Sequence, residues 1–128
     1  MRFLIALVFL GHGFAHLVGF FVFWRLAEFE EMPYKTTLLA GRIDVGETGI
    51  RVVGILWLAA ALAFFTCLTA VIPPFEWWLT ATLWTTVFSL ALCISGWPDS
   101  RFGVVANLLI LAFLAIGGWL GWLPVAVR

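Results

Sequence analysis

The sequence predicts an all-α integral membrane protein, a four-helix up-down-up-down bundle in a single domain. The chain of 128 residues is 64% hydrophobic and only 11% charged, whereas soluble domains are about 25% charged. Four apolar runs are each long enough to cross a hydrocarbon core of about 30 Å. In lipid, runs of this length satisfy their backbone hydrogen bonds as helices. They cover approximately residues 3–24, 49–72, 76–95 and 102–123.

The first run contains the chain's two histidines, His12 and His16, near its midpoint. They are one helical turn apart and share a face. An ionisable side chain at this depth is costly in lipid, so the face is expected to look into protein or water. Gly11, Ala15 and Gly19 form a row of small residues that allows another backbone to approach. Two neutral histidines could also serve only to hold helices together by hydrogen bonds.

The segment 25–48 is expected to be a loop that holds most of the charge. At its end, Asp44 is predicted to be the N-cap of the second helix, with Glu47 at the third helical position. Glu47 and Arg51 are then four residues apart on one face, a spacing that favours an ion pair.

Short connections at 72–76 and 95–100 make sequential helices antiparallel. The start of the first helix and the end of the fourth then lie on one face of the membrane, which we call side A. The first and third loops lie on the opposite face, side B. Side B carries more Lys and Arg, which favours its facing the cytoplasm. Within the membrane, Trp57 and Trp84 are expected to be packing residues. Four further residues share one face of the third helix and are also expected to pack against neighbouring helices. They are Thr82, Thr86, Ser89 and Cys93.

Buried polar residues are predicted to converge in the side-B half of the bundle. His16 lies roughly 12 Å and Asn107 roughly 8 Å below the side-B ends of their helices, at 1.5 Å per residue. We expect a ligand pocket that is open to side B. His12 and His16 would form its floor, and Asn107 would form one flank. The residues at its mouth would be Arg51, Glu47 and Asp44. Zinc needs three or four ligands, so two histidines do not suggest a metal site. The sequence also lacks the common catalytic motifs, and no catalytic residue is assigned.

Two short motifs resemble those of the DoxX-like group of small four-helix bacterial membrane proteins. Leu10-Gly11-His12-Gly13 is similar to the His-Gly motif in that group's first helix. Glu47, ahead of Gly49 and Gly54, is similar to its acidic entry into a glycine-rich second helix. The resemblance implies a bacterial inner (plasma) membrane location and an association with quinone-linked or thiol-stress complexes.

Three functions remain open at this stage. The pocket could bind a hydrophobic, quinone-like ligand, since histidine titrates near neutrality and can donate to a quinone oxygen; the chain would then act alone or as an accessory subunit of a redox complex. It could instead be a structural or assembly subunit without a ligand, in a homo-oligomer or larger complex. A small oligomeric transporter or channel is the third class. Nothing suggests a nucleic-acid partner, because the chain has no basic cluster.

Overall fold

The computed structural model describes residues 1–126, and within them the chain forms an all-helical bundle. Its helices are α1 (Arg2–Phe23), α2 (Gly46–Val71), α3 (Trp78–Ser95) and α4 (Arg101–Leu120). All four are long and apolar enough to cross a membrane. The predicted fold class is therefore confirmed, and the chain is a multi-pass membrane protein in contact with the lipid bilayer.

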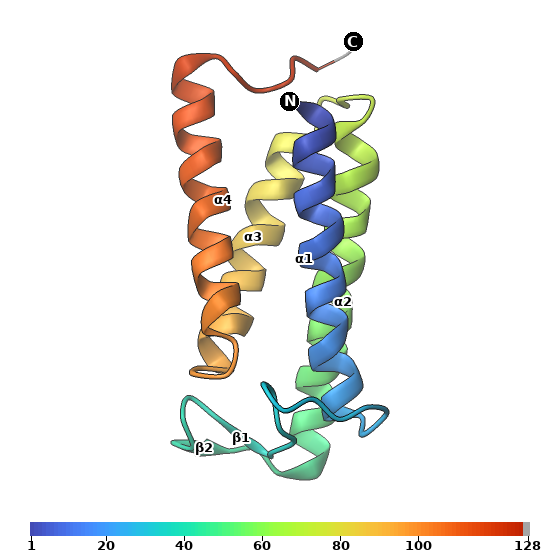
Figure 1. Cartoon of the computed structure of the whole chain (residues 1–128), viewed down its shortest axis with the longest axis vertical. Helices are drawn as coiled ribbons and strands as arrows, with labels where there is room; N and C mark the ends of the chain where they lie inside the picture. Colours follow the sequence, from blue (N-terminus) through green and yellow to red (C-terminus); the bar gives the residue numbers. More distant parts are fainter. Residues whose placement is uncertain (127–128) are drawn as a thin grey trace.

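Successive helices run in opposite directions (Figure 1). The start of α1 and the end of α4 lie at the same end of the bundle, which is side A. The figure also shows α1 beside α2, with α4 standing apart from α1. Indeed, α1 contacts α4 much less than it contacts α2. The bundle is therefore packed unevenly around its axis, and its loosest seam lies between the first and last helices.

The segment between α1 and α2 contains a short antiparallel hairpin that the sequence analysis did not predict, formed by β1 (Thr37–Leu38) and β2 (Ile43–Asp44). The hairpin turn is attached to the α3–α4 connection. The Leu39 N–H donates to the Ser95 carbonyl at 2.8 Å, and the Ala40 N–H donates to the Trp97 carbonyl at 2.9 Å. The first loop is therefore an ordered cover tied to the far side of the bundle.

The predicted N-cap of the second helix is wrong by one residue. The N-cap is Val45 rather than Asp44, and α2 begins at Gly46, three residues before the apolar run that starts at residue 49. Asp44 ends β2 instead, where its carboxylate accepts hydrogen bonds from the Gly46 N–H and the Thr36 hydroxyl, both at 2.9 Å. The hairpin accounts for the difference, because Asp44 is paired with Thr37 in the sheet and its carboxylate bonds the N–H of Gly46, the first residue of α2, rather than that of the second or third helical residue.

The two deep tryptophans have opposite environments. Trp57 is 4% exposed, as expected of a packing residue, but Trp84 is 68% exposed. The buried face of α3 is the predicted hydroxyl stripe, in which Thr82 and Thr86 are fully buried. Trp84 lies two residues from each of them, about 200° around the helix. The packing prediction for Trp84 is therefore wrong, and its ring faces the lipid.

Glycines allow α1 and α2 to lie against each other. A Cβ at Gly19 would lie 2.5 Å from the Trp57 ring, and one at Gly13 would lie 2.5 Å from the Phe65 ring. Real Cβ atoms essentially never come this close to another atom. By contrast, a Cβ at Gly11 would meet nothing within 4 Å. Of the predicted small row, Gly19 therefore acts at a helix contact inside this chain, whereas Gly11 does not.

Replacing Gly19 by leucine should destabilise the bundle. The added side chain must displace the Trp57 ring, and overpacking of this kind costs about 1–3 kcal/mol. The measurement is the unfolding free energy in mixed micelles. Gly11→Leu is the matched control on the same helix and should leave that free energy nearly unchanged. Equal stability of the two variants would contradict this account of the α1–α2 contact.

Candidate ligand-binding site

Polar side chains from three helices meet inside the apolar bundle. His12 and His16 come from α1, Ser89 from α3 and Asn107 from α4, and all four are buried. His12 Nε2 lies 3.2 Å from Asn107 Oδ1 and 3.3 Å from Ser89 Oγ. His16 Nε2 lies 2.5 Å from the same Ser89 Oγ. The structure thus brings together three of the predicted site residues, with Ser89 as the link between them.

The hydrogen positions in this network follow from its geometry. The Asn107 amide nitrogen donates to the Gly103 carbonyl at 2.8 Å, so the amide oxygen faces His12. That oxygen can only accept, and His12 Nε2 therefore carries a hydrogen. Ser89 has one hydroxyl hydrogen, which the protonated His12 Nε2 cannot accept. The hydrogen is thus available to His16 Nε2, an arrangement that places the ring hydrogen of His16 on Nδ1.

Two ring nitrogens at the edge of this network have no hydrogen-bond partner among residues 1–126. They are His16 Nδ1 and Trp57 Nε1, in rings whose centroids are 4.9 Å apart. His16 Nδ1 lacks a partner in either tautomer, because Ser89 occupies the other nitrogen. A buried polar group without a partner costs about 1–3 kcal/mol. A ligand that accepted hydrogen bonds here would recover that energy.

Both side chains line one cavity of about 210 Å³, which we call the histidine cavity. It extends from the middle of the bundle to side B. Its walls come from all four helices and both side-B loops, and comprise His12, Ala15, His16, Val18, Glu31, Met32, Trp57, Cys93, Asp99, Ser100, Phe102 and Gly103. Trp78 Nε1 and Thr82 Oγ1 are also unpartnered, but neither residue lines this cavity.

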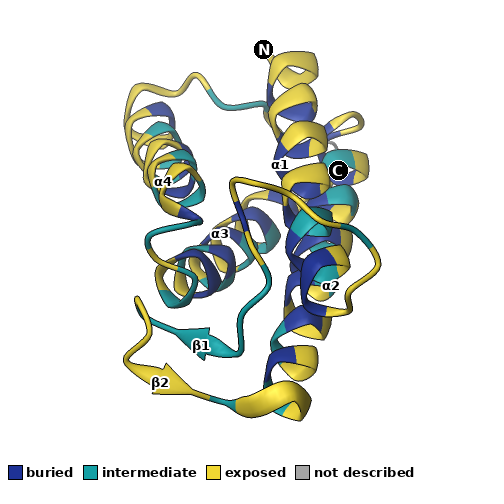
Figure 2. Cartoon of the chain, turned by 60° about the horizontal axis from the view of Figure 1, so that its bottom comes forward, coloured by how far each residue is buried: buried dark blue, intermediate teal, exposed yellow. Residues whose placement is uncertain are grey.

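The first loop forms much of the cavity mouth. Figure 2 shows the segment between α1 and β1 lying across the side-B end of the helices. Met32 is buried there against the core, and the Lys35 ammonium lies 2.5 Å from the Asp99 carboxylate. Glu31 adds a second carboxylate to the lining. The mouth is therefore charged, in contrast to the aromatic interior.

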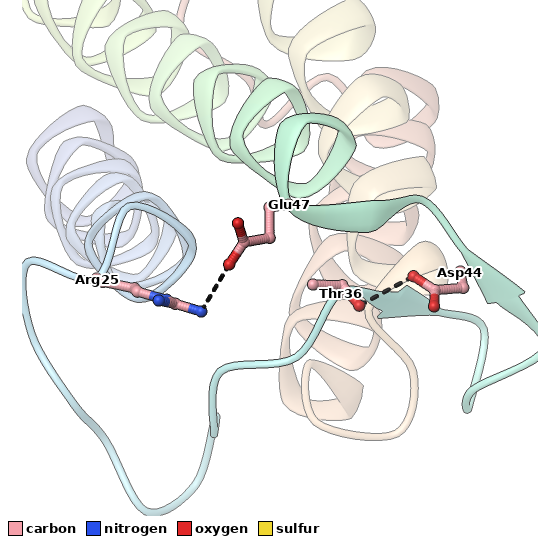
Figure 3. A network of polar contacts seen from close by, with 4 residues as sticks. All are labelled: Arg25, Thr36, Asp44 and Glu47. Atoms are coloured by element: carbon pink, nitrogen blue, oxygen red, sulfur yellow. Dashed lines mark hydrogen bonds and ion pairs between the residues drawn. The ribbon is translucent and has the colours of Figure 1, made fainter.

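The three residues predicted to guard the mouth lie elsewhere, Asp44 at the end of β2 and Glu47 and Arg51 in the first turns of α2. The Glu47 carboxylate pairs with Arg25 at 3.0 Å rather than with Arg51 (Figure 3). The Arg51 guanidinium lies 5.7 Å from the Trp24 ring centroid, and Asp44 is bonded within the hairpin (Figure 3). None of the three lines the histidine cavity. The pair prediction failed because the end of α1 lies beside the start of α2 and brings Arg25 within reach.

Sequence reasoning missed Glu31, Met32 and Trp57 as lining residues. Gly19 gives the Trp57 ring its space, but no pattern in the sequence distinguishes the buried Trp57 from the exposed Trp84. No local pattern marks Met32 or Glu31. Their position depends on the fold of the whole first loop. Within residues 1–126, no group of three His, Cys, Asp or Glu residues could hold a metal ion.

No protein family, curated protein or solved structure matches the chain in comparisons of sequence and structure. Its function is therefore argued from the geometry of the histidine cavity.

Substituting Ser89 by alanine should destabilise the bundle more than the same change at Ser95. Among residues 1–126, Ser89 is the hydrogen-bond partner that His16 Nε2 would lose in Ser89→Ala, and hydrogen bonds between membrane helices average about 0.6 kcal/mol with a maximum of about 1.7 kcal/mol. The Ser95 hydroxyl donates to the Leu92 carbonyl of its own helix. Unfolding in mixed micelles gives both values. A smaller loss for Ser89→Ala would show that the network does not stabilise the fold.

The Asp44 carboxylate provides a test of the hairpin. The Gly46 N–H and then the Thr36 hydroxyl lower the pKa of Asp44 below its usual value of 3.8. A lowered pKa means that this stabilising contribution is present above pH 3.8 and is lost as pH falls through the folded-state pKa. Thr36→Val should raise the pKa while leaving it below 3.8, because the Gly46 bond remains. An NMR titration of the carboxyl carbon measures it, with Thr37→Val as the neighbouring control that should cause no shift.

Proposed function

We propose that this chain is a bacterial inner-membrane protein that binds a lipophilic, quinone-like ligand in the histidine cavity, alone or as an accessory subunit of a membrane redox complex. The observation that carries the proposal is the pair of unpartnered nitrogens, His16 Nδ1 and Trp57 Nε1, on side chains that line one cavity. The DoxX-like motifs at His12 and Glu47 agree with this class of function.

The donor pattern favours a ligand whose head accepts hydrogen bonds. The indole N–H of Trp57 can only donate. His16 Nδ1 also donates when Ser89 gives its hydrogen to Nε2. A quinone is soluble in the bilayer, and its carbonyl oxygen is an uncharged hydrogen-bond acceptor. It can accept from both donors without bringing a charge into the membrane.

The shape of the lining favours a planar ring. The His16 and Trp57 rings line the cavity together, with centroids 4.9 Å apart, and the Phe64 ring, which lies outside the lining, stacks on His16 and holds it in place. Ligand sites are typically lined by apolar and aromatic side chains with a few polar groups that orient the ligand. Asn107 acts indirectly in this proposal, because both ends of its amide are already bonded and it positions His12.

An assembly subunit without a ligand is the second candidate. It is favoured by α4, which buries only Asn107, Ile110 and Gly117 within the chain. The exposed residues of that helix, which include Phe102, Leu109 and Trp119, contact lipid or another protein. Both candidates predict a stable bundle, and they differ in whether the histidine cavity binds a small molecule.

Replacing Trp57 by phenylalanine should weaken ligand binding without loss of an existing hydrogen bond, since Trp57 Nε1 has no partner. We expect about a fivefold rise in the Kd of a 1,4-benzoquinone, equivalent to about 1 kcal/mol for one hydrogen bond. Equilibrium dialysis of the protein in nanodiscs gives the Kd. Trp84→Phe removes the same atoms from a lipid-facing ring and should leave the Kd unchanged.

A second variant, His16→Leu, removes the other donor and should also raise the Kd. If the wild-type protein binds no benzoquinone, or if both variants bind it as well as the wild type does, the ligand proposal fails. Native mass spectrometry of the same samples then tests the assembly role, through the oligomer or partner that it retains.

A further inference from the structure

A second cavity, of about 310 Å³, lies between α1 and α4 in the side-A half of the bundle. We call it the apolar cavity. Its lining comes from α1 between Met1 and Phe9 and from α4 between Ala106 and Leu114, and every lining residue is apolar. No group there can hydrogen-bond a ligand through its side chain. The apolar cavity therefore suits a hydrocarbon chain and nothing more polar.

The apolar cavity and the histidine cavity occupy consecutive turns of the same two helices. On α1 the apolar lining ends at Phe9 and the histidine lining begins at His12. On α4 the histidine lining ends at Gly103 and the apolar lining begins at Ala106. Each step is three residues, about one helical turn. The two cavities therefore follow one another along the seam between α1 and α4, with no lining residue in common, and the chemistry of the lining changes at the level of His12.

We infer that the apolar cavity holds the hydrocarbon tail of the ligand whose head lies in the histidine cavity. This inference rests on the proposed function and names the ligand class: a ring with hydrogen-bond acceptors joined to an alkyl or isoprenoid chain. Sites for drug-sized ligands have volumes of about 300–1,000 Å³. The histidine cavity, at about 210 Å³, is below that range, so it takes the head alone.

The direction of the tail follows from the two ends of the seam. Towards side B, a tail would pass the carboxylates of Glu31 and Asp99 and the Lys35–Asp99 ion pair. Towards side A, it would meet only apolar side chains. Asn107 is fully buried, so its hydrogen bond to His12 lies on the inner wall of the seam. The ligand enters sideways from the bilayer between α1 and α4, with its tail trailing towards side A.

Photo-crosslinking can locate the tail directly. The probe is a 1,4-benzoquinone carrying an alkyl chain with a diazirine near its end, added to the protein in nanodiscs. We expect adducts on the α1 and α4 segments that line the apolar cavity, mapped by peptide mass spectrometry. These adducts should be lost when excess tail-free benzoquinone is added and when His16 is replaced by leucine. A diazirine fatty acid controls for general lipid contact, and its labelling should be unaffected by either change.

A matched pair of variants on α4 tests the cavity itself. Ala106→Phe fills the apolar cavity at the α4 end of its lining that is nearest in sequence to the histidine cavity, whereas Ala112→Phe adds the same ring on an exposed part of the helix outside the lining. Ala106→Phe should lose the cavity adducts, and Ala112→Phe should retain them. Both variants should bind tail-free benzoquinone as the wild type does, which shows that they are folded.

The outcomes separate this inference from the proposed function. If tail-free benzoquinone binds but the tailed probe labels the same positions as the fatty acid, the apolar cavity holds ordinary bilayer lipid and the inference is wrong. If Ala106→Phe keeps the cavity adducts, the tail lies elsewhere and the inference is also wrong. If neither quinone binds, the proposed function fails, and the inference fails with it.

Discussion

The hydrogen bond between His12 and Asn107 joins the two helices that otherwise hold each other most weakly around the bundle. The core of a bilayer contains no water to hydrogen-bond with polar side chains, so their hydrogen-bond partners must come from the protein. Ser89 extends the bond to a third helix and to His16. Each member limits the freedom of the others. A shift of α4 would separate Asn107 from His12, and a turn of α1 would take both histidines away from Ser89.

Close packing elsewhere explains why the α1–α4 seam is the open one. Glycines bring α1 onto α2, where Gly19 admits Trp57, and Gly103 brings α4 onto α3 beside Cys93. The α1–α2 contact is the most extensive, and α3 contacts both α2 and α4. The α1–α4 side is bridged by the hydrogen bond between His12 and Asn107 rather than by extensive packing. Because apolar side chains gain little by leaving lipid for one another, such a seam can remain open without large cost. Both cavities lie along it.

The helices could be predicted from the sequence because length and hydropathy alone decide which segments cross a bilayer. The meeting of His12, His16 and Asn107 was also predictable. Polar side chains in membrane helices face the interior of the bundle, and those at a similar depth in a small bundle come close together. Residues of the first loop were not. Met32 and Glu31 line the cavity in a loop that is tied to the α3–α4 connection by its hairpin, and this long-range contact has no local signal in the sequence. Trp84 shows the opposite limit, since depth in the membrane does not reveal which way a side chain faces.

The change of chemistry along the seam depends on one turn of helix. On the side-A side of His12, a ligand meets only apolar side chains, and it gains little by exchanging lipid for that surface. On the side-B side of His12, it meets the unpartnered nitrogens of His16 and Trp57, for which the membrane offers no other hydrogen-bond partner. For the ligand proposed above, selectivity therefore comes from the head, while the tail determines only the path of approach. A lipid without a hydrogen-bond acceptor could fill the apolar half, but it would leave both nitrogens unsatisfied.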